Sequence, residues 1–324
     1  MKNILVITTG GTISMKASKS GVIPSLSGKE ILELIPRIKD IAELSLHEFS
    51  NIPSPMMTPE MMFELSKYIT EVIDNYDGIV ITHGTDTVEE TAYMLFLTLQ
   101  TMKPIVLTAA MRSNEESGLD GPRNLLNAVR VATNDKSINR GVVLAINDEI
   151  FSAREVYKSS TNLTNAFEAP HYGTLGIVDA DDVIYYRRSE FRYKYQVEKL
   201  EYKVELIKLF SGIGRKFIDC SIDSGTKGIV IEAFGRGNVN PEIKAGILYA
   251  IKCGIPVVIT SRVPTGRVLG IYAYEGGAKQ LEEAGAIMAG DLKGEKARLK
   301  LMVLLGKKMN NNQIEDSFLE DRGN

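Results

Sequence analysis

The sequence predicts an α/β fold with two domains: a larger N-terminal domain whose mostly parallel sheet is flanked by helices, and a smaller C-terminal α/β domain. The chain has 324 residues and is 44% hydrophobic, which is enough for two cores because domains commonly contain roughly 100 to 200 residues. Short, continuous apolar runs recur, with segments of helical spacing between them. Strands that alternate with helices in this way are typical of a mostly parallel sheet.

The predicted strands are apolar runs without polar alternation, which indicates strands that are covered on both faces. They lie at residues 4–7, 79–81, 105–107 and 142–144, and then at 229–231 and 256–259.

Helix starts are recognisable between these runs. Thr58 followed by Pro59 indicates an N-cap with proline at the first helical position. Thr87 and Glu90 have the spacing of a capping box, and Asp120 precedes a Gly-Pro pair that opens a further helix.

A charged and aromatic stretch at residues 187–195 interrupts the alternation of strands and helices. We therefore expect the N-terminal domain at residues 1–190, a connecting segment at 191–212 and the C-terminal domain at 213–324. No internal repeat is evident.

The charge balance argues against nucleic acid and membrane partners. The formal net charge is -3, with 38 Lys and Arg residues against 41 Asp and Glu residues, so the sequence lacks the basic surface that such partners attract. No signal peptide is recognisable, and no apolar run is long enough to cross a bilayer. We expect a cytoplasmic protein that binds a small molecule.

Metal chemistry is not expected from the cysteines and histidines. Cys220 and Cys253 are too few for a disulfide framework or a zinc site, and we expect both to fill the core. The three histidines, His47, His83 and His171, lack the spacing of a helical metal pair.

The residues that follow the strands carry the functional signal, because ligands of open α/β sheets bind beyond the carboxyl ends of the strands. Residues 8–13 (Thr-Thr-Gly-Gly-Thr-Ile) and 82–87 (Thr-His-Gly-Thr-Asp-Thr) each place a threonine next to a glycine. A single turn of this kind is more often a simple β-to-α connection. Neither a dinucleotide fingerprint nor a P-loop is present. We expect the two turns to face each other across a shared pocket.

A threonine hydroxyl needs a base before it can act as a nucleophile. Thr12 and Thr85 are the candidate nucleophiles, and Asp86 is placed to orient a cation. Lys158 is a candidate for that cation, although a lysine taken alone is usually solvated.

With these motifs, the chain resembles the bacterial-type L-asparaginase family, which includes the glutaminase-asparaginases. The resemblance covers nearly the whole chain and is carried by residues 9–13, 77–87, 109–112, 120–125, 235–239 and 274–277. It implies an amidohydrolase that needs no cofactor. Thr12 matches the family's nucleophile, and Thr85, Asp86 and Lys158 match the group that activates the nucleophile or the hydrolytic water.

The resemblance also implies the substrate contacts. Ser54 and Asp86 match residues that hold the α-carboxylate and the α-ammonium, and the Ala110 carbonyl would accept from the leaving amide. Asn238 and Glu275 match the contribution of the C-terminal domain to the site of a neighbouring subunit, which implies a homodimer or a homotetramer.

Two positions depart from the family pattern. Val22 stands where a loop tyrosine is common, so another hydroxyl or the pair of Lys158 and Asp86 must help to activate Thr12. Pro55 replaces the glutamine that usually follows Ser54.

The leading hypothesis is hydrolysis of L-asparagine to L-aspartate and ammonia, with possible minor glutaminase activity. One alternative is a sensor that binds aspartate or asparagine without turnover, which calorimetry without ammonia release would indicate. Another is the amidase component of a tRNA-dependent amidotransferase, which usually carries an additional N-terminal domain. The preference between asparagine and glutamine stays open, because one methylene changes binding by only about 1 to 3 kcal/mol.

Overall fold

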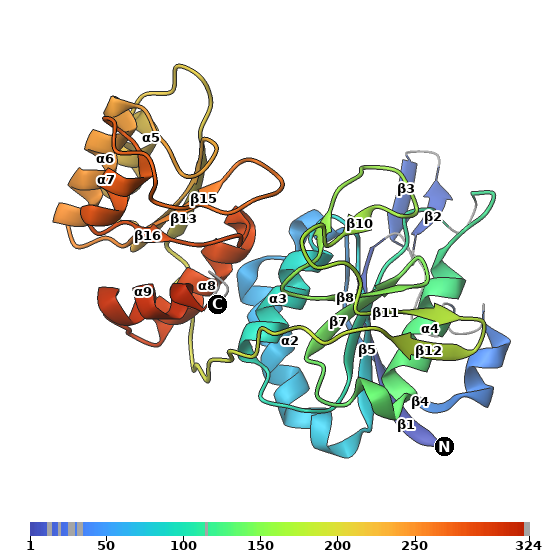
Figure 1. The fold of residues 1–324 in the computed structure, drawn as a ribbon. Coiled ribbons are helices and arrows are strands. Elements are labelled where there is room, and N and C mark those ends of the chain that lie inside the picture. Colours follow the sequence, from blue (N-terminus) through green and yellow to red (C-terminus); the bar gives the residue numbers. More distant parts are fainter. Residues whose placement is uncertain (12–14, 19–20, 25–29, 31–34, 114–115, 321–324) are drawn as a thin grey trace. The chain divides into compact units, whose positions relative to one another are not determined.

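The chain folds into two compact units, Met1–Lys194 and Tyr195–Asn324. The computed structural model describes residues 1–11, 15–18, 21–24, 30, 35–113 and 116–320 (Figure 1). Strand β13 (Val204–Lys208) lies within the segment 191–212 that was expected to be a connection. Its side chains are buried at Val204 and Ile207 and more exposed at the other positions, so it lacks the continuous apolar run by which the other strands were recognised.

A large sheet forms the centre of the first unit. Its strand order in the described residues is β12-β11-β8-β7-β6-β5-β1-β4. The strands are β1 (Lys2–Gly10), β4 (Ala42–Ile52), β5 (Gly78–Thr82), β6 (Ile105–Thr108), β7 (Val142–Ile146), β8 (Glu149–Ser152), β11 (Gly176–Asp179) and β12 (Asp182–Tyr185). The strands from β4 to β7 pair in parallel, which confirms the predicted sheet.

The remaining strands of this sheet, β8, β11 and β12, pair antiparallel. Asn147 and Asp148 both adopt positive φ between β7 and β8, which suits a tight hairpin turn. These strands have four residues each, too few for a clear periodic pattern.

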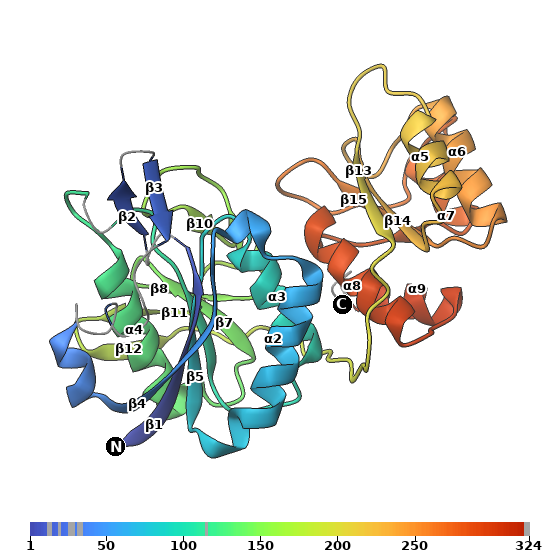
Figure 2. The same cartoon turned by 180° about the vertical axis from the view of Figure 1, so that it is seen from behind.

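Helices cover both faces of the sheet. Helices α2 (Pro59–Val72) and α3 (Val88–Thr98) lie on one face and α4 (Gly121–Thr133) on the other (Figures 1 and 2). The predicted N-cap of α2 is confirmed, because the Thr58 hydroxyl accepts from the Met61 N–H at 3.3 Å. The predicted opening of α4 after Asp120 is also confirmed.

Short elements complete the first unit. They are β2 (Met15–Ser18), β3 (Gly21–Pro24), β9 (Tyr157–Lys158), β10 (Phe167–Glu168), η2 (Pro36–Asp40), η3 (Ser54–Met56), η4 (Ile73–Asn75) and η5 (Asp135–Ser137).

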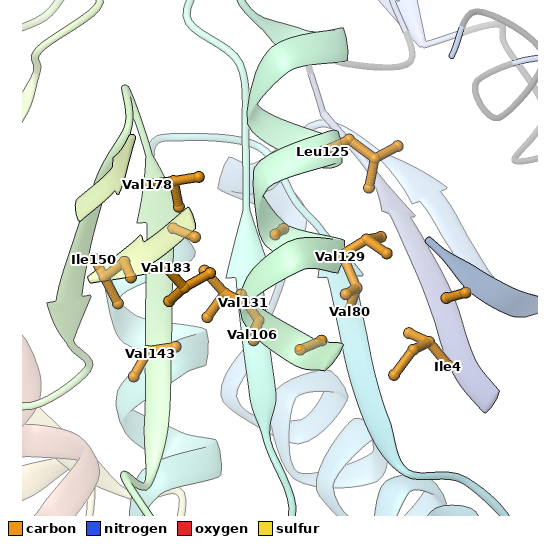
Figure 3. Close-up of a cluster of buried hydrophobic side chains, with 14 of the residues drawn as sticks. Ile4, Val80, Val106, Leu125, Val129, Val131, Val143, Ile150, Val178 and Val183 are labelled. Carbon is orange, nitrogen blue, oxygen red and sulfur yellow. The ribbon is translucent and has the colours of Figure 1, made fainter. Parts of the chain in front are cut away.

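The core between α4 and the sheet fixes the strands that carry the site (Figure 3). Leu125 and Val129 of α4 pack in one cluster with Ile4, Val80 and Val106, and all five are fully buried. Burial of such side chains contributes about 1.5 to 3 kcal/mol each. The carboxyl ends of β1, β5 and β6 therefore have well-defined positions.

The second unit is built on a smaller sheet in which β13, β14 (Gly228–Ala233), β15 (Val257–Ser261) and β16 (Ile287–Met288) pair in parallel in that order. Its helices are α5 (Lys216–Asp223), α6 (Pro241–Lys252), α7 (Ala278–Glu283), α8 (Gly294–Gly306) and α9 (Asn311–Leu319). The second α/β unit predicted from the sequence is thus present.

The expectation that both cysteines fill the core is wrong. Cys220 and Cys253 are free and exposed. Cys220 lies on α5, and Cys253 follows the last residue of α6, so both belong to the ends or outer faces of surface helices. Across the described chain, no helix is long and apolar enough to cross a membrane.

Candidate active site

Two glycine turns meet at the carboxyl edge of the large sheet. Thr8 of β1 pairs in register with Thr82 of β5, so the segments after these strands leave the sheet side by side. A Cβ atom added to Gly11 would lie 2.3 Å from the Gly84 Cα, which shows that the two backbones are in contact. The two turns therefore contact each other at these glycines.

The first turn depends on glycine. Gly10 and Gly11 have φ of 105° and 81°, values that residues with a Cβ rarely adopt. The Gly11 N–H donates to the Ile52 carbonyl at 3.1 Å, which anchors the turn to β4. Thr12 comes next in the sequence and lies outside the described residues, as does any contact of the Val22 side chain.

Ser54 forms two hydrogen bonds with the second turn. Its Oγ accepts from the Asp86 N–H at 3.2 Å, and its carbonyl accepts from the Thr87 hydroxyl at 2.7 Å. A Cβ on Gly84 would lie 2.7 Å from the Ser54 Oγ. Ser54 is buried, so its hydroxyl is held close to the turn.

The prediction of a capping box at Thr87 is wrong, although the predicted start of the helix is correct. Helix α3 does begin at Val88 with Thr87 at the N-cap position, but the Thr87 side chain makes no cap hydrogen bond. Its hydroxyl donates to Ser54 instead. The residue therefore joins two segments of the candidate site, a tertiary contact that the local spacing cannot reveal.

Lys158 joins Thr85 and Asp86 in one hydrogen-bonded group. Its ammonium donates to the Thr85 Oγ1 at 2.9 Å and to the Asp86 Oδ1 at 2.6 Å. The Lys158 side chain is only 14% exposed, whereas the Asp86 side chain is 58% exposed. The ordinary expectation of a solvated lysine therefore does not apply, and one charge-assisted group connects a buried hydroxyl to an open carboxylate.

The segment before Lys158 is held by an ion pair between a buried glutamate and a partly buried arginine. The Glu155 side chain is 1% exposed and lies 2.5 Å from the guanidinium of Arg187. Arg187 also donates to the Thr174 carbonyl. Lys158 itself lies opposite Phe167 in the pairing of β9 with β10. These contacts fix the backbone from which Lys158 extends.

Ala110 follows β6 at the same edge of the sheet and is fully buried. Asn124 of α4 donates to the Ala109 carbonyl at 2.9 Å, and the Asp120 carboxylate accepts from the Met111 N–H at 3.0 Å. The backbone around Ala110 is thus fixed by the first turn of α4.

His83 was considered in the sequence only as a metal ligand, but it lies at the candidate site. The side chain is fully buried, with Nδ1 2.8 Å from the Gly84 carbonyl oxygen and Nε2 2.9 Å from the Thr91 hydroxyl. Burial lowers the pKa of His83 to about 4. The position of His83 immediately before Gly84 and Thr85 in the sequence could have indicated that it lies at the site.

Asn238 and Glu275 belong to the second unit. The Asn238 Oδ1 accepts from the Ala278 N–H at 3.2 Å, and the Val239 N–H donates to the Gly276 carbonyl at 2.8 Å. These contacts hold the turn of Asn238 against the segment that carries the exposed Glu275. The structure thus brings the two residues into adjacent segments of one unit.

The titratable residues at the site do not form a metal-binding cluster. Wherever side chains are described, no group of three or more His, Cys, Asp or Glu residues is placed to hold an ion. The hydroxyls of Thr85 and Ser54, the Lys158 ammonium and the Asp86 carboxylate are suited to proton transfer and to binding a small zwitterion.

Comparison with known proteins gives a consistent match over most of the chain. The family model "Asparaginase, N-terminal" matches residues 3–191, and the model "Glutaminase/Asparaginase C-terminal domain" matches residues 203–318. The L-asparaginase of Bacillus licheniformis is 36% identical over 94% of this chain and 95% of its own length. The probable periplasmic L-asparaginase of Haemophilus influenzae is 37% identical over 98% of this chain and 93% of its own length.

Two further proteins extend this match, one named for a second activity and one with a solved structure. A glutaminase-asparaginase of Pseudomonas aeruginosa is 31% identical over 99% of this chain and 91% of its own length. The crystal structure of a probable cytoplasmic L-asparaginase from Campylobacter jejuni superimposes with a TM-score of 0.90 at 35% identity, covering 98% of this chain and 99% of the other.

Proposed function

Because the chain belongs to the asparaginase family, we propose that it hydrolyses the side-chain amide of L-asparagine to give L-aspartate and ammonia. The observation that carries this proposal is the ammonium of Lys158, which is shared between the Thr85 hydroxyl and the Asp86 carboxylate. Such a group can move a proton next to a reacting carbonyl without a cofactor.

The proposed nucleophile is Thr12. Its oxygen forms a bond to the amide carbon, its proton passes to the amide nitrogen, and the carbon–nitrogen bond breaks to release ammonia. Water then attacks the ester, aspartate leaves, and a proton returns to the Thr12 oxygen. The position of Thr12 directly after the Gly11 turn, which touches Gly84, supports this assignment.

Lys158 and Thr85 are assigned to proton transfer. The ammonium already donates to the Thr85 oxygen, so it stabilises negative charge on that oxygen when the Thr85 proton leaves. Once Lys158 gives up a proton, its amine can accept one from Thr85 or from the hydrolytic water. Asp86 holds the ammonium in place through its Oδ1.

The proposed substrate contacts match the two charges of an α-amino acid. The Ser54 Oγ uses a lone pair to accept from the Asp86 N–H, which leaves its hydroxyl hydrogen for the α-carboxylate. The open Asp86 carboxylate attracts the α-ammonium. The Ala110 carbonyl accepts from the leaving amide.

Asn238 and Glu275 are assigned to the site of a neighbouring subunit, which makes the active form a homodimer or a homotetramer. The exposure of Glu275 and its link to the turn of Asn238 support a shared role. We also infer a cytoplasmic location, because free and exposed thiols at Cys220 and Cys253 suit a reducing compartment. Fractionation of the source cells tests the location.

Glutamine is proposed as a minor substrate, because one relative is named a glutaminase-asparaginase. An added methylene changes transition-state binding by only about 1 to 3 kcal/mol. A pocket that accepts asparagine is therefore expected to retain some turnover of glutamine.

The test is ammonia release from L-asparagine, L-glutamine and D-asparagine by the purified protein, with Thr12→Ala as the control. Rapid release from L-asparagine that is lost in Thr12→Ala supports the hydrolase and its nucleophile. Release that persists in Thr12→Ala moves the nucleophile to another residue. Tight binding of asparagine in calorimetry without ammonia contradicts the hydrolase and favours a sensor.

A further inference from the structure

His83 occupies a fully buried position between the end of β5 and helix α3. The His83 N–H donates to the Thr108 carbonyl at 2.9 Å, so the backbone at this point is still part of the sheet edge. The imidazole contacts the Gly84 carbonyl through Nδ1 and the Thr91 hydroxyl through Nε2. Both ring nitrogens thus have hydrogen-bond partners inside the protein.

We propose that His83 is a positioning residue whose neutral imidazole, held by Thr91 of α3, donates through Nδ1 to the Gly84 carbonyl and so orients and polarises the Gly84–Thr85 peptide group. The inference rests on the proposed hydrolysis, in which Thr85 belongs to the reacting site. It adds a hydrogen-bonded connection from Thr91 of α3 to the turn that carries Gly84 and Thr85.

The hydrogen-bond chemistry fixes the direction of this chain. The Gly84 carbonyl oxygen can only accept, so Nδ1 must carry the ring hydrogen. In a neutral imidazole Nε2 is then an acceptor, and the Thr91 hydroxyl must be its donor. Desolvation, which lowers the His83 pKa to about 4, keeps the ring neutral at physiological pH. The chain therefore runs from Thr91 through the imidazole to the Gly84 carbonyl.

The effect of this chain falls on Thr85. A hydrogen bond to the Gly84 carbonyl shifts peptide electron density toward oxygen and makes the Thr85 N–H a stronger donor, because bonds in a chain polarise one another. Among the described residues, none accepts a hydrogen bond from this N–H. It is therefore available to an oxyanion that forms nearby. The same peptide bond sets the direction of the Thr85 side chain toward Lys158.

The first test reads the tautomer directly. Protein with ¹⁵N-labelled histidine rings is measured by long-range ¹H–¹⁵N correlation at pH 7, with His83→Asn used to assign the signals. We expect a neutral ring with the hydrogen on Nδ1, the minor form of free histidine. A ring with its hydrogen on Nε2, or a charged ring, overturns the inference.

The second test compares two identical substitutions in α3. Thr91→Val removes the donor to His83, whereas Thr98→Val removes another buried hydroxyl, which bonds to Ser66 and to the Met94 carbonyl away from the site. We expect Thr91→Val to lower kcat for L-asparagine about tenfold with KM nearly unchanged, because a weakened oxyanion donor acts on the transition state. Thr91→Ser, which keeps the hydroxyl, should restore most of the rate.

The outcomes separate a positioning role from simple packing. Equal losses of kcat in Thr91→Val and Thr98→Val, or no recovery in Thr91→Ser, contradict the inference even when all variants fold. His83→Asn retains a donor near the position of Nδ1, whereas His83→Gln does not, so His83→Asn should be the more active of the two. If wild-type protein releases no ammonia, the proposed hydrolysis fails, and the ring tautomer alone decides the hydrogen-bond chain.

Discussion

The Nζ atom of Lys158 lies 2.9 Å from the Oγ1 atom of Thr85, although 73 residues separate the two in the chain. Thr85 comes from the turn after a central strand, and Lys158 comes from a two-residue strand that follows Glu155, the buried partner of Arg187. The contact therefore joins two separate segments of the first unit. Its geometry depends on both of them, which makes the pair suited to repeated proton transfer.

Replacement of Lys158 by methionine is expected to abolish most turnover. The substitution keeps much of the length of the side chain but removes the ammonium that Thr85 and Asp86 share. Loss of a positioned proton-transfer group typically lowers rates by about 10² to 10⁴, and we expect kcat for L-asparagine to fall in that range. Steady-state ammonia release measures the effect.

The matched control for this substitution is Lys194→Met. Lys194 is also partly buried in the first unit, where its ammonium donates to the Thr101 carbonyl away from the candidate site. It should keep near wild-type turnover. Similar losses of activity in the two variants, with both folded, would show that the Lys158 effect is a general consequence of removing a buried charge.

Gly11→Ala is expected to destabilise the protein and to disturb the site together. The residue has φ of 81°, and its Cβ would lie 2.3 Å from the Gly84 backbone. The positive φ alone costs about 1 to 2 kcal/mol, and the clash must separate the two turns. Gly173→Ala isolates the first effect, because Gly173 has φ of 70° with open space around it. Urea unfolding should show a clearly larger loss for Gly11→Ala, and equal losses would exclude a clash.

Much of the fold was predictable because buried segments have a recognisable apolar composition. Strands such as β5 and β7, which are covered on both faces, are uninterrupted apolar runs, and caps such as Thr58 act through bonds to residues three positions away. Strands β11, β12 and β13 were not predictable from the same signal. β13 lies at the edge of its sheet and mixes polar with apolar residues, and β11 and β12 are too short for any pattern to stand out.

The candidate site was predictable as a set of residue types but not as a set of contacts. The motifs placed Thr85 and Asp86 at a strand end, yet only the folded chain brings Lys158 to them. The bond from Thr87 to Ser54 replaced an expected local cap for the same reason. Contacts between segments far apart in sequence leave no periodic or spacing signal.

The pH dependence of stability should contain a contribution from His83. The unfolded chain binds a proton at this residue as pH falls through about 6.5, whereas burial in the folded protein lowers the pKa to about 4. Stabilisation is thus complete above pH 6.5 and is lost as pH falls toward 4. Between pH 7.5 and pH 5 the expected loss is about 2 kcal/mol.

Urea unfolding at these two pH values tests this contribution in wild-type protein and in His83→Asn. The carboxylates titrate in both proteins and cancel in the comparison. The variant should therefore lose less stability than the wild type between pH 7.5 and pH 5. Equal losses would mean that His83 takes up a proton in the folded state as readily as in the unfolded chain.

The proposed sharing of the site between subunits can be decided with two inactive variants. Thr85→Val removes a hydroxyl of the first unit, and Glu275→Ala removes an exposed carboxylate of the second unit. If each site combines the first unit of one subunit with the second unit of its neighbour, a mixed dimer contains one site in which both parts are wild type. If each site is formed within one chain, no mixture contains such a site.

Co-expression of Thr85→Val and Glu275→Ala with different affinity tags allows the mixed oligomer to be purified through both tags. Equal, random mixing of two subunits makes half of the dimers mixed, and each mixed dimer has one intact site of two, so the unsorted pool should recover about one quarter of wild-type activity. The sorted mixed dimer should recover about half. Each variant purified alone sets the background rate. A sorted mixed oligomer that stays at this background would place Glu275 and Thr85 of the same chain in one site, or would remove Glu275 from the site.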